Sequence, residues 1–360
     1  MSIKWCKSCI LPDTRPNLKI DSTGICNACK NHKTKKEINW EKRRKNLYEI
    51  CNYVKNKAQH YDCLIPVSGG KDSTWQTIKC LELGLKPLAL TWKPPGRTLI
   101  GQRNLENLIR LGVDHIDYSI NPKVEAKFML KTFKRFGSTA IPMHLALFNL
   151  PLKIATSLRI PLIIWGENSA FEYGNSDKDD LGFNLDSNWI KKYGVTHGTT
   201  AKDWIDNDLT KKELNAYFGP SEKEMIDFNV KAIFLGSYLK WDPKNTRDIA
   251  VKEGFQISKN GAKTGLYDFA DIDDDYISIH HWIKWYKFGF TRLFDNLSLE
   301  IRNGRISRDE ALQKIIDLGD QTPKRDIKLF CKFASIEEKE LYQIAEKFRN
   351  NAIWKKDDRF

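Results

Sequence analysis

The stretch PVSGGKDSTW, residues 66–75, constrains the fold of this chain more than any other feature. An apolar run, Cys63–Val67, leads into it, and a run with helical character, Thr74–Leu83, follows it. A buried strand, a glycine-rich turn and a helix in direct succession are typical of the repeating unit of a parallel α/β sheet. The stretch therefore predicts an α/β domain that begins near residue 61.

The alternation of strands and helices continues after this stretch. Four more segments have strand character: Pro87–Trp92, His115–Tyr118, Pro161–Trp165 and Lys231–Tyr238. Between the first and second of these segments a helix is expected at Asn104–Leu111, and between the second and third at Phe128–Phe136 and Met143–Leu158. This order predicts a parallel sheet with helices on both faces.

The segment Ser68–Ser73 combines several groups that bind an oxyanion. Gly69 and Gly70 carry no side chain, so backbone N–H groups can converge there, and the following helix directs its positive end at the same point. Lys71 adds a charge, the two serines add hydroxyl donors, and Asp72 either caps the helix or helps to hold magnesium. The alternative is an ordinary strand-to-helix turn with an N-cap residue.

Four of the eight cysteines lie at the N-terminus in two Cys-x2-Cys pairs, Cys6 with Cys9 and Cys26 with Cys29. This spacing is typical of structural four-thiolate zinc sites, which need no redox change and leave no open position. The surrounding segment has little apolar content, so the metal would supply most of its folding energy. A redox dithiol or four unrelated buried cysteines are the alternatives.

Lys and Arg outnumber Asp and Glu by 59 to 46, which gives a formal net charge of +13. A basic surface attracts anionic nucleotides, acidic sugars or nucleic acid, but these basic residues are scattered, so a solvated basic surface is favoured over a nucleic-acid site. The first residues lack the apolar core of a signal peptide, and no apolar stretch approaches the length of a membrane span. We expect a cytoplasmic protein without membrane contact.

Polar residues that follow the other predicted strands are further candidates for the site. The stretch Gly166–Asn168 follows Pro161–Trp165 at its carboxyl end, where open α/β sheets bind ligands, and Glu167 is a candidate for magnesium or nucleotide. Thr91 and Trp92 close the second strand and are candidates for the adenine or ribose pocket. For each position, a polar loop without a role in the site is the alternative.

Candidates for substrate binding lie in the second half of the chain. Glu172 and Tyr173 belong to the polar segment after the fourth helix, and His280 and His281 precede an aromatic stretch and are candidates for proton transfer. A core or surface role for both histidines is the alternative.

Arginines and aspartates near the C-terminal end form two further groups. Arg292 and Arg302, with Arg305 and Arg308, present guanidinium groups that match a carboxylate or phosphate, or else form salt bridges on a helix face. The acidic run 271–275 is either a metal site or a solvated surface.

The string SGGKDS, set between a strand and a helix, resembles the loop of the PP-loop ATP pyrophosphatases, which have a Rossmann-like fold. The resemblance implies that ATP is split between its α and β phosphates and that AMP passes to a substrate oxygen. Together with the candidates at the carboxyl ends of the other strands, nucleotide binding is expected at Ser68–Ser73, Thr91, Trp92, Gly166 and Asn168. The resemblance also implies catalytic roles for Lys71, Asp72 and Glu167, with Mg²⁺.

Several longer blocks resemble the N-acetyl sugar amidotransferase family of the WbpG/PseA type. They run in the family's order across nearly the whole chain: CKSCILPDTRPNLKIDSTGICNAC (6–29), SGGKDSTWQ (68–76), WGENSAFEYG (165–174), LGSYLKWDP (235–243) and IHHWIKWYKFGFTRLFDNLSLEIRNGRISRDEA (279–311). The resemblance implies that an acetamido group of a sugar becomes an acetamidino group, for a surface glycan or for flagellin glycosylation. The implied substrate is a nonulosonic acid or a diacetamido uronic acid, either free or linked to a nucleotide.

The chain has no glutaminase signature of its own, because its second residue is Ser and no G-x-C-x-G elbow occurs. The resemblance therefore implies a partner glutaminase, together with a synthase subunit like that of histidine biosynthesis, to supply ammonia. Two alternatives remain: a tRNA thiolase with zinc-binding cysteines, and a nucleotide-binding scaffold without catalysis. Thiolation is disfavoured because only Cys80 and Cys331 follow the loop.

These patterns predict four parts of the chain. Residues 1–35 form a zinc ribbon, and residues 36–60 a connecting helix, centred on Trp40–Lys57. Residues 61–245 form the PP-loop domain, with residues 166–228 as an insertion over the site. Residues 246–360 form a mainly helical region that binds substrate or a partner.

Overall fold

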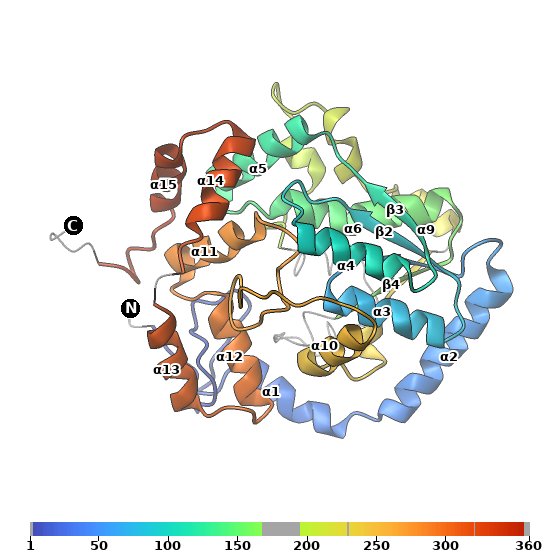
Figure 1. Cartoon of the computed structure of the whole chain (residues 1–360), viewed down its shortest axis with the longest axis horizontal. Helices are drawn as coiled ribbons and strands as arrows, with labels where there is room; N and C mark the ends of the chain where they lie inside the picture. Colours follow the sequence, from blue (N-terminus) through green and yellow to red (C-terminus); the bar gives the residue numbers. More distant parts are fainter. Residues whose placement is uncertain (1–2, 168–194, 229, 320, 356–360) are drawn as a thin grey trace.

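The protein is described by a computed structural model of the full chain, which describes residues 3–167, 195–228, 230–319 and 321–355. A parallel sheet lies at the centre of the α/β part, with helices on both of its faces (Figure 1). A helical C-terminal region packs beside it, and four cysteines cluster at the N-terminus. The expected fold class is therefore confirmed.

Among the described residues, the sheet has five strands in the order β3-β2-β1-β4-β5, and every neighbouring pair is parallel. The chain runs from β1 to β3 on one side of β1 and then places β4 and β5 on the other side. In open α/β sheets ligands bind at such a reversal, beyond the carboxyl ends of the strands. The loops after β1 and β4 therefore flank the expected site. The strands are β1 (Cys63–Pro66), β2 (Pro87–Trp92), β3 (Asp114–Tyr118), β4 (Leu162–Trp165) and β5 (Lys231–Phe234).

Successive side chains of each central strand point to opposite faces and so feed two separate cores. On one face, Leu64 and Ile163 pack against helices α5 (Pro122–Phe136) and α6 (Ile141–Ser157). On the other face, the core built on Cys63 and Ile65 also contains the helices α2 (Trp40–Lys57), α3 (Lys71–Glu82) and α4 (Leu99–Ile109). Strands that are buried on both faces consist of continuous apolar residues, so they could be predicted from the sequence.

The expected helices exist, but four of them begin earlier than the apolar periodicity indicated, α6 by only two residues, at Ile141 instead of Met143. Helix α3 begins at Lys71 instead of Thr74, α4 at Leu99 instead of Asn104, and α5 at Pro122 instead of Phe128. The first turns of α4 and α5 are fixed by the cap residues Thr98 and Asn121, whose side chains accept backbone N–H groups. The first turn of α5 is mostly polar, and that of α4 contains Gly101 and the exposed Leu99, so neither turn adds to a buried apolar stripe and the pattern missed both.

The expected strand Lys231–Tyr238 is only half right, because β5 ends at Phe234. The 3-10 turn η5 (Leu235–Ser237) follows it, and the Gly236 N–H donates to the Gly166 carbonyl at 2.9 Å. Helix α10 (Pro243–Lys252) comes next, but residues 253–276 contain no helix, contrary to the expectation of a mainly helical chain beyond 245. This irregular stretch lines the cavity described in the next subsection.

The part of residues 166–228 that the structure describes beyond Glu167 packs against α5 and α6 through Trp204, Leu214 and Tyr217. It includes the 3-10 turns η3 (Ala201–Trp204) and η4 (Glu213–Tyr217) and helix α9 (Glu222–Phe228). Residues 168–194 lie outside the described residues.

The C-terminal region consists of five helices that form two shared cores. Helices α11, α14 and α15 pack with Met129 and Phe133 of α5. Helices α12 and α13 pack instead against the N-terminal cysteines and Ile10, Leu11 and Leu18, so the ribbon shares its core with the other end of the chain. The helices are α11 (Ile277–Phe288), α12 (Arg292–Arg302), α13 (Arg308–Leu318), α14 (Lys324–Ala334) and α15 (Glu338–Glu346), and the ribbon ends in α1 (Asn27–Thr34) and η1 (Lys35–Glu37).

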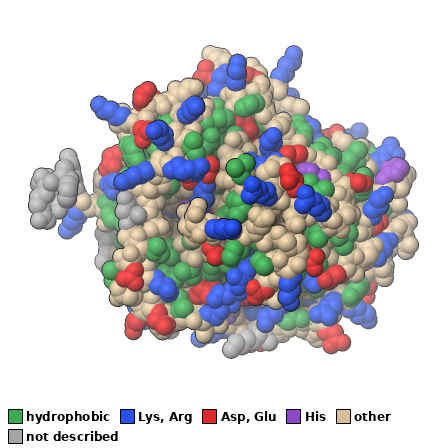
Figure 2. All heavy atoms as spheres, in the orientation of Figure 1, with side chains coloured by type: hydrophobic (Ala, Val, Ile, Leu, Met, Phe, Trp, Pro, Cys, Tyr) green, Lys and Arg blue, Asp and Glu red, His purple; other side chains and the backbone are tan. Residues whose placement is uncertain are grey.

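The surface shown in Figure 2 carries Lys and Arg side chains spread among acidic and other groups. On this face they do not merge into one continuous basic track, as the scattered pattern of the sequence indicated. Within the described part of the chain, no helix combines the length and apolar character needed to cross a membrane.

Candidate active site and metal centre

A cavity of about 390 Å³ opens where β1 and β4 end. The glycine-rich loop forms its floor, and Trp92, Met143, Leu147 and Glu167 line one side. The irregular stretch before α11 supplies much of the rest. The lining residues from beyond β5 are Trp241, Pro243, Tyr267, Phe269, Ala270, Asp271, Ile272, Asp273, Asp274, Ile277, Arg292 and Asn296.

The loop owes its shape to Gly69, whose φ is +86°. A Cβ atom at this position would lie 2.6 Å from the backbone nitrogen of Leu105 on α4, so only glycine fits. Gly70 is the N-cap of α3 and gives no side-chain cap, so the start of this helix faces the cavity without a capping side chain. The expectation that Asp72 caps the helix is wrong, because Asp72 lies inside the first turn.

Asp72 is held from two sides by residues distant in sequence. Its Oδ1 accepts hydrogen bonds from Trp241 Nε1 at 2.9 Å and from Thr246 Oγ1 at 3.3 Å. Its Oδ2 forms an ion pair with the ammonium of Lys71. Lys71 is only 6% exposed and lies 5.3 Å from the ring centroid of Trp241 and 5.7 Å from that of Phe269. Aromatic faces stabilise such a buried cation while leaving it able to meet an anion.

Three aspartates, Asp271, Asp273 and Asp274, line the cavity beside the loop and form what we call the acidic wall, so the run 271–275 is not simply a solvated surface. Burial raises the pKa of Asp274 to about 7, and its Oδ1 accepts the Tyr276 N–H at 3.0 Å. Burial also raises the pKa of Asp273, against the effect of a hydrogen bond with Ser68. Burial, the largest single effect, would raise the pKa of Asp271, but the charges of Arg292 and His281 and the hydrogen bonds from His281 and Thr264 together lower it.

The side wall of the cavity rests on a buried acid. Trp92 Nε1 donates to Glu125 Oε1 at 2.8 Å, and Glu125 is only 2% exposed. Burial raises the pKa of Glu125 to about 8, so this carboxyl is mainly protonated at neutral pH. Glu125 lies on α5, beneath the cavity wall, and orients the indole of Trp92.

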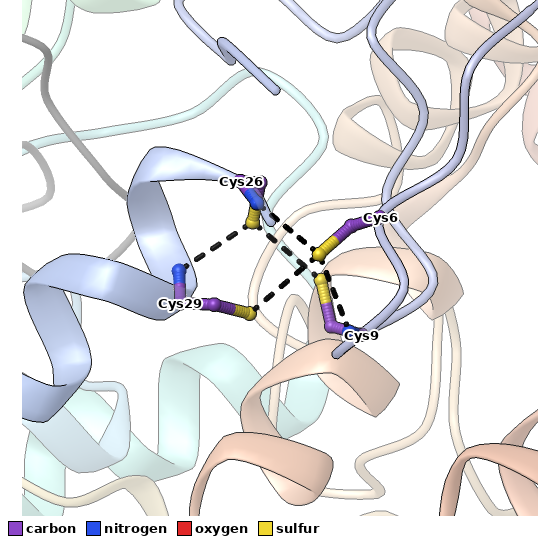
Figure 3. A group of neighbouring side chains, drawn as sticks. All are labelled: Cys6, Cys9, Cys26 and Cys29. Atoms are coloured by element: carbon purple, nitrogen blue, oxygen red, sulfur yellow. Dashed lines mark hydrogen bonds between the residues drawn. The ribbon is translucent and has the colours of Figure 1, made fainter. Parts of the chain in front are cut away.

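The four N-terminal cysteines converge from two turns, as Figure 3 shows. Their sulfur atoms all lie within 4.8 Å of one another, with Cys6 and Cys29 at 4.0 Å and Cys9 and Cys26 at 3.7 Å. A tetrahedron with zinc–sulfur bonds of about 2.3 Å has edges of about 3.8 Å. Backbone N–H groups of Cys9, Cys26 and Cys29 also point at the sulfurs. The geometry fits a four-thiolate zinc site.

With this geometry established, comparison with known proteins identifies the C-terminal region. Residues 264–360 match the family model described as the LPS biosynthesis protein WbpG-like, C-terminal domain. The match covers only this C-terminal part, which is similar to that domain and is called the WbpG-like domain below. The acidic wall and the aromatic residues Tyr267 and Phe269 therefore belong to the WbpG-like domain, which closes the cavity over the loop.

A comparison with curated proteins returned no match. Among solved structures, a predicted subunit of tRNA methyltransferase from Methanocaldococcus jannaschii is similar at 14% identity, over 52% of this chain and 75% of its own, with a TM-score of 0.29. The NMN synthetase from Francisella tularensis is similar at 14% identity, over 62% of this chain and 89% of its own, with a TM-score of 0.27.

Most of the candidates around the loop lie together. The residues that line the cavity are Ser68, Gly70, Lys71, Asp72, Ser73, Trp92, Glu167 and Arg292. Three other candidates support this region from behind. Gly69 packs on α4, the Thr91 hydroxyl lies 2.9 Å from His115 Nε2, and the Gly166 carbonyl accepts the Gly236 N–H. Asn168, Glu172 and Tyr173 lie outside the described residues.

The candidate residues His280, His281 and Arg302 of the WbpG-like domain lie in different places. His281 lies 3.4 Å from Asp271, whereas His280 is buried beside Ser138 and does not line the cavity. Burial lowers the pKa of His280 well below its ordinary value, which disfavours a charged role. Arg302 lies near Cys29 instead of the cavity, and its charge lowers the pKa of that thiol, after the larger effect of Cys26.

The other two arginines of that group form structural contacts of the WbpG-like domain. Arg305 bridges Glu300 and Asp242, and the Arg308 Nε donates to the Cys9 carbonyl at 3.2 Å. The expectation that these arginines form salt bridges is therefore confirmed for Arg305.

Several residues of the site were not singled out from the sequence. Trp241 lies in the block LGSYLKWDP, which pointed to a family but not to a partner for Asp72. Thr246 on α10 and Phe269 carry no local signal, and the block 279–311, which contains Asn296, gave no hint of a place at the cavity, because each of these contacts depends on how distant elements fold over the loop.

Proposed function

We propose that this protein is an ATP-dependent amidotransferase that converts the acetamido group of an N-acetyl sugar into an acetamidino group. The observation that carries this proposal is the composition of the cavity. Its floor is the loop that resembles those of PP-loop enzymes, and its opposite wall belongs to a domain of the WbpG-like family of LPS biosynthesis. A nucleotide on the loop and a sugar held by that domain would meet in one space.

The loop supplies the groups that a pyrophosphate needs. Backbone N–H groups at the start of α3 and the ammonium of Lys71 would bind its oxygens. The carboxylates of Asp72, Glu167 and Asp273 line the same cavity and are the candidate ligands for Mg²⁺, which prefers oxygen. Trp92 and Met143 offer an apolar surface for adenine.

The reaction follows from these groups. The acetamide oxygen attacks the α-phosphorus of ATP, and pyrophosphate leaves. Ammonia then adds to the adenylated carbon, a proton leaves the nitrogen, and AMP departs with the former acetamide oxygen. Asp274, with a pKa of about 7 and a place in the wall, is suited to take that proton.

Ammonia would come from a partner glutaminase acting with a synthase subunit like that of histidine biosynthesis. All eight cysteines of the chain are buried, so this chain offers no exposed thiol nucleophile for hydrolysing glutamine. The same observation disfavours a tRNA thiolase, which would need a sulfur carrier at the site, because none of the cysteines lines the cavity.

The test is incubation with ATP, Mg²⁺, ammonium and N-acetylated sugar acids. We expect release of AMP and pyrophosphate that depends on the sugar, with a product in which NH replaces one oxygen atom, detected by mass spectrometry. Lys71→Ala and Asp72→Ala should abolish pyrophosphate release while zinc content stays unchanged. If tRNA alone stimulates pyrophosphate release, the sugar proposal fails and thiolation gains.

A further inference from the structure

Arg302 is the last residue of α12, and its charge has no polar partner among the described residues. The Nε, Nη1 and Nη2 atoms are all buried, and none of them donates a hydrogen bond. No carboxylate of the described chain forms an ion pair with this guanidinium. Burying a cation without a partner is costly, so a side chain in this position needs an anionic neighbour.

The neighbours of Arg302 include the four-cysteine cluster. Leu297 of α12 belongs to the same core as the cysteines, and Ile301, the residue before Arg302, packs against that core. A hydrogen bond with Cys26 is the main effect that lowers the pKa of the Cys29 thiol, and the positive charge of Arg302 adds to it. The guanidinium is therefore close enough to Cys29 to stabilise negative charge on its sulfur.

Backbone donors are shared unevenly among the four sulfur atoms. Cys6 Sγ accepts the N–H groups of Cys9 at 3.4 Å and Cys26 at 3.3 Å, and Cys26 Sγ accepts that of Cys29 at 3.4 Å (Figure 3). Within the described chain, no backbone N–H donates to the sulfur of Cys9 or of Cys29. Donors to the ligands of a metal hold them in place and tune its affinity. Arg302 can thus supply a donor to a sulfur that the backbone leaves without one.

Other cations near the ribbon are already occupied. Lys30 pairs with Asp21, and the Arg308 Nε donates to the Cys9 carbonyl at 3.2 Å. A four-thiolate zinc centre carries a net negative charge, because four thiolates outweigh one Zn²⁺. The centre therefore needs a cation, and Arg302 is a buried cation without a partner in the described part of the chain.

We propose that Arg302 is the charge partner of the metal centre and donates to the Cys29 thiolate when zinc is bound. Arg292 and Asn296 of the same helix line the cavity, so this contact ties the helix that forms part of the cavity to the loaded ribbon. Arg302 is then a positioning residue of the metal centre, instead of a group that meets the substrate. The inference does not rest on the proposed function, because it concerns only the ribbon and α12.

The first test measures zinc affinity of the full chain by competition with a chromogenic chelator. Arg302→Met removes the charge but keeps a long side chain, and we expect zinc to bind about tenfold or more weakly. Arg302→Lys keeps the charge without the planar fork and should lie between Arg302→Met and the wild type. Lys314→Gln, at an exposed position of α13, removes the same charge and should bind zinc like the wild type. Equal zinc affinity of Arg302→Met and the wild type overturns the proposal, and so does a wild type that binds no zinc.

The second test compares melting temperatures with and without zinc. The zinc-loaded Arg302→Met variant should melt below the loaded wild type, because the thiolates lose their counter-charge. After chelation under reducing conditions, the variant should melt at the same temperature as the wild type or higher, because an unpaired cation is no longer buried. An equal fall in both states would mean that Arg302 contributes only packing, and the proposal would fail.

Cobalt(II) separates loss of charge from loss of the ribbon fold. Co²⁺ accepts thiolates in a tetrahedral arrangement, and its absorption bands report that arrangement. Arg302→Met should show the bands of the wild type at saturating cobalt and need about tenfold more free cobalt to reach half of their intensity. If the bands disappear in Arg302→Met but persist in Lys314→Gln, Arg302 maintains the ribbon fold instead of the charge of the centre, and the proposal is wrong.

Discussion

The indole Nε1 of Trp241 donates a hydrogen bond to Oδ1 of Asp72 at 2.9 Å, although 169 residues separate them. The ring of the same tryptophan lies 5.3 Å from the ammonium of Lys71. One side chain from beyond β5 thus positions both charged residues of the loop after β1. This contact joins the two halves of the sheet at the point where its strand order reverses.

Trp241→Phe should lower the rate of pyrophosphate release by about tenfold, because Asp72 loses a hydrogen bond to a charged acceptor. Trp204→Phe is the matched control, since it removes an equally buried indole N–H bond, to Thr199, away from the cavity. Rates are compared in a coupled pyrophosphate assay, alongside thermal melting. An equal loss of rate in both variants would mean that Trp241 acts only through general stability.

Gly69 and Gly70 should respond differently to alanine. Gly69→Ala combines a left-handed φ with a clash against the α4 backbone, so we expect a fall in melting temperature of more than about 4 °C and loss of ATP binding. Gly70 has a φ of −69°, and a Cβ there would meet only Ser68 Oγ at 3.2 Å. Gly70→Ala should therefore melt close to the wild type. Similar melting of both variants would contradict the assigned loop geometry.

Loss of the metal centre should destabilise the WbpG-like domain as well as the ribbon. The cysteines share a core with Leu293, Phe294 and Leu297 of α12. We expect Cys26→Ser to lose bound zinc, measured by mass spectrometry of metals, and to melt at a lower temperature. A chelator should lower the melting temperature of the wild type but change that of Cys26→Ser little.

Cys331→Ser is the control for the metal prediction. Cys331 is buried in the separate core of α11, α14 and α15, so this variant should keep its zinc even if its stability falls. Zinc retained by Cys26→Ser at the wild-type stoichiometry would show that the four sulfurs do not form the site.

Glu125 should give the folded protein a pH dependence of definite sign. Its pKa is raised by burial from an ordinary value of 4.5 to about 8, so the folded state holds a proton that the unfolded chain has lost. This contribution to stability is complete below the ordinary pKa and is lost as the pH rises through about 8. Glu125→Gln cannot ionise, and its amide oxygen can still accept from Trp92.

The measurement for Glu125 is the melting temperature between about pH 6 and about pH 9. The wild type should lose stability across this range by more than Glu125→Gln does, and Glu49→Gln, at an exposed position of α2, should follow the wild type. A variant that falls as steeply as the wild type would assign the pH dependence to another group.

Local chemistry was enough to predict much of the fold. Strands β1, β2 and β4 are apolar runs because both faces of the sheet are covered. The turn Ser68–Gly70 could be recognised from its glycines. The spacing of Cys6, Cys9, Cys26 and Cys29 predicted the four-cysteine cluster in the same way. In each case the residues that interact lie within one turn, strand or short segment.

The sequence by itself determined the α/β unit, the loop and the cysteine cluster, whereas the tertiary structure decided what surrounds the loop. Only the fold brings Trp241 to Asp72, lays residues 267–274 across the cavity and separates His280 and Arg302 from it. Periodicity reports which face of an element is buried, but not which distant element covers that face. That choice depends on how the two shared cores of the WbpG-like domain pack against α5 and the ribbon, and no local stretch of the chain encodes it.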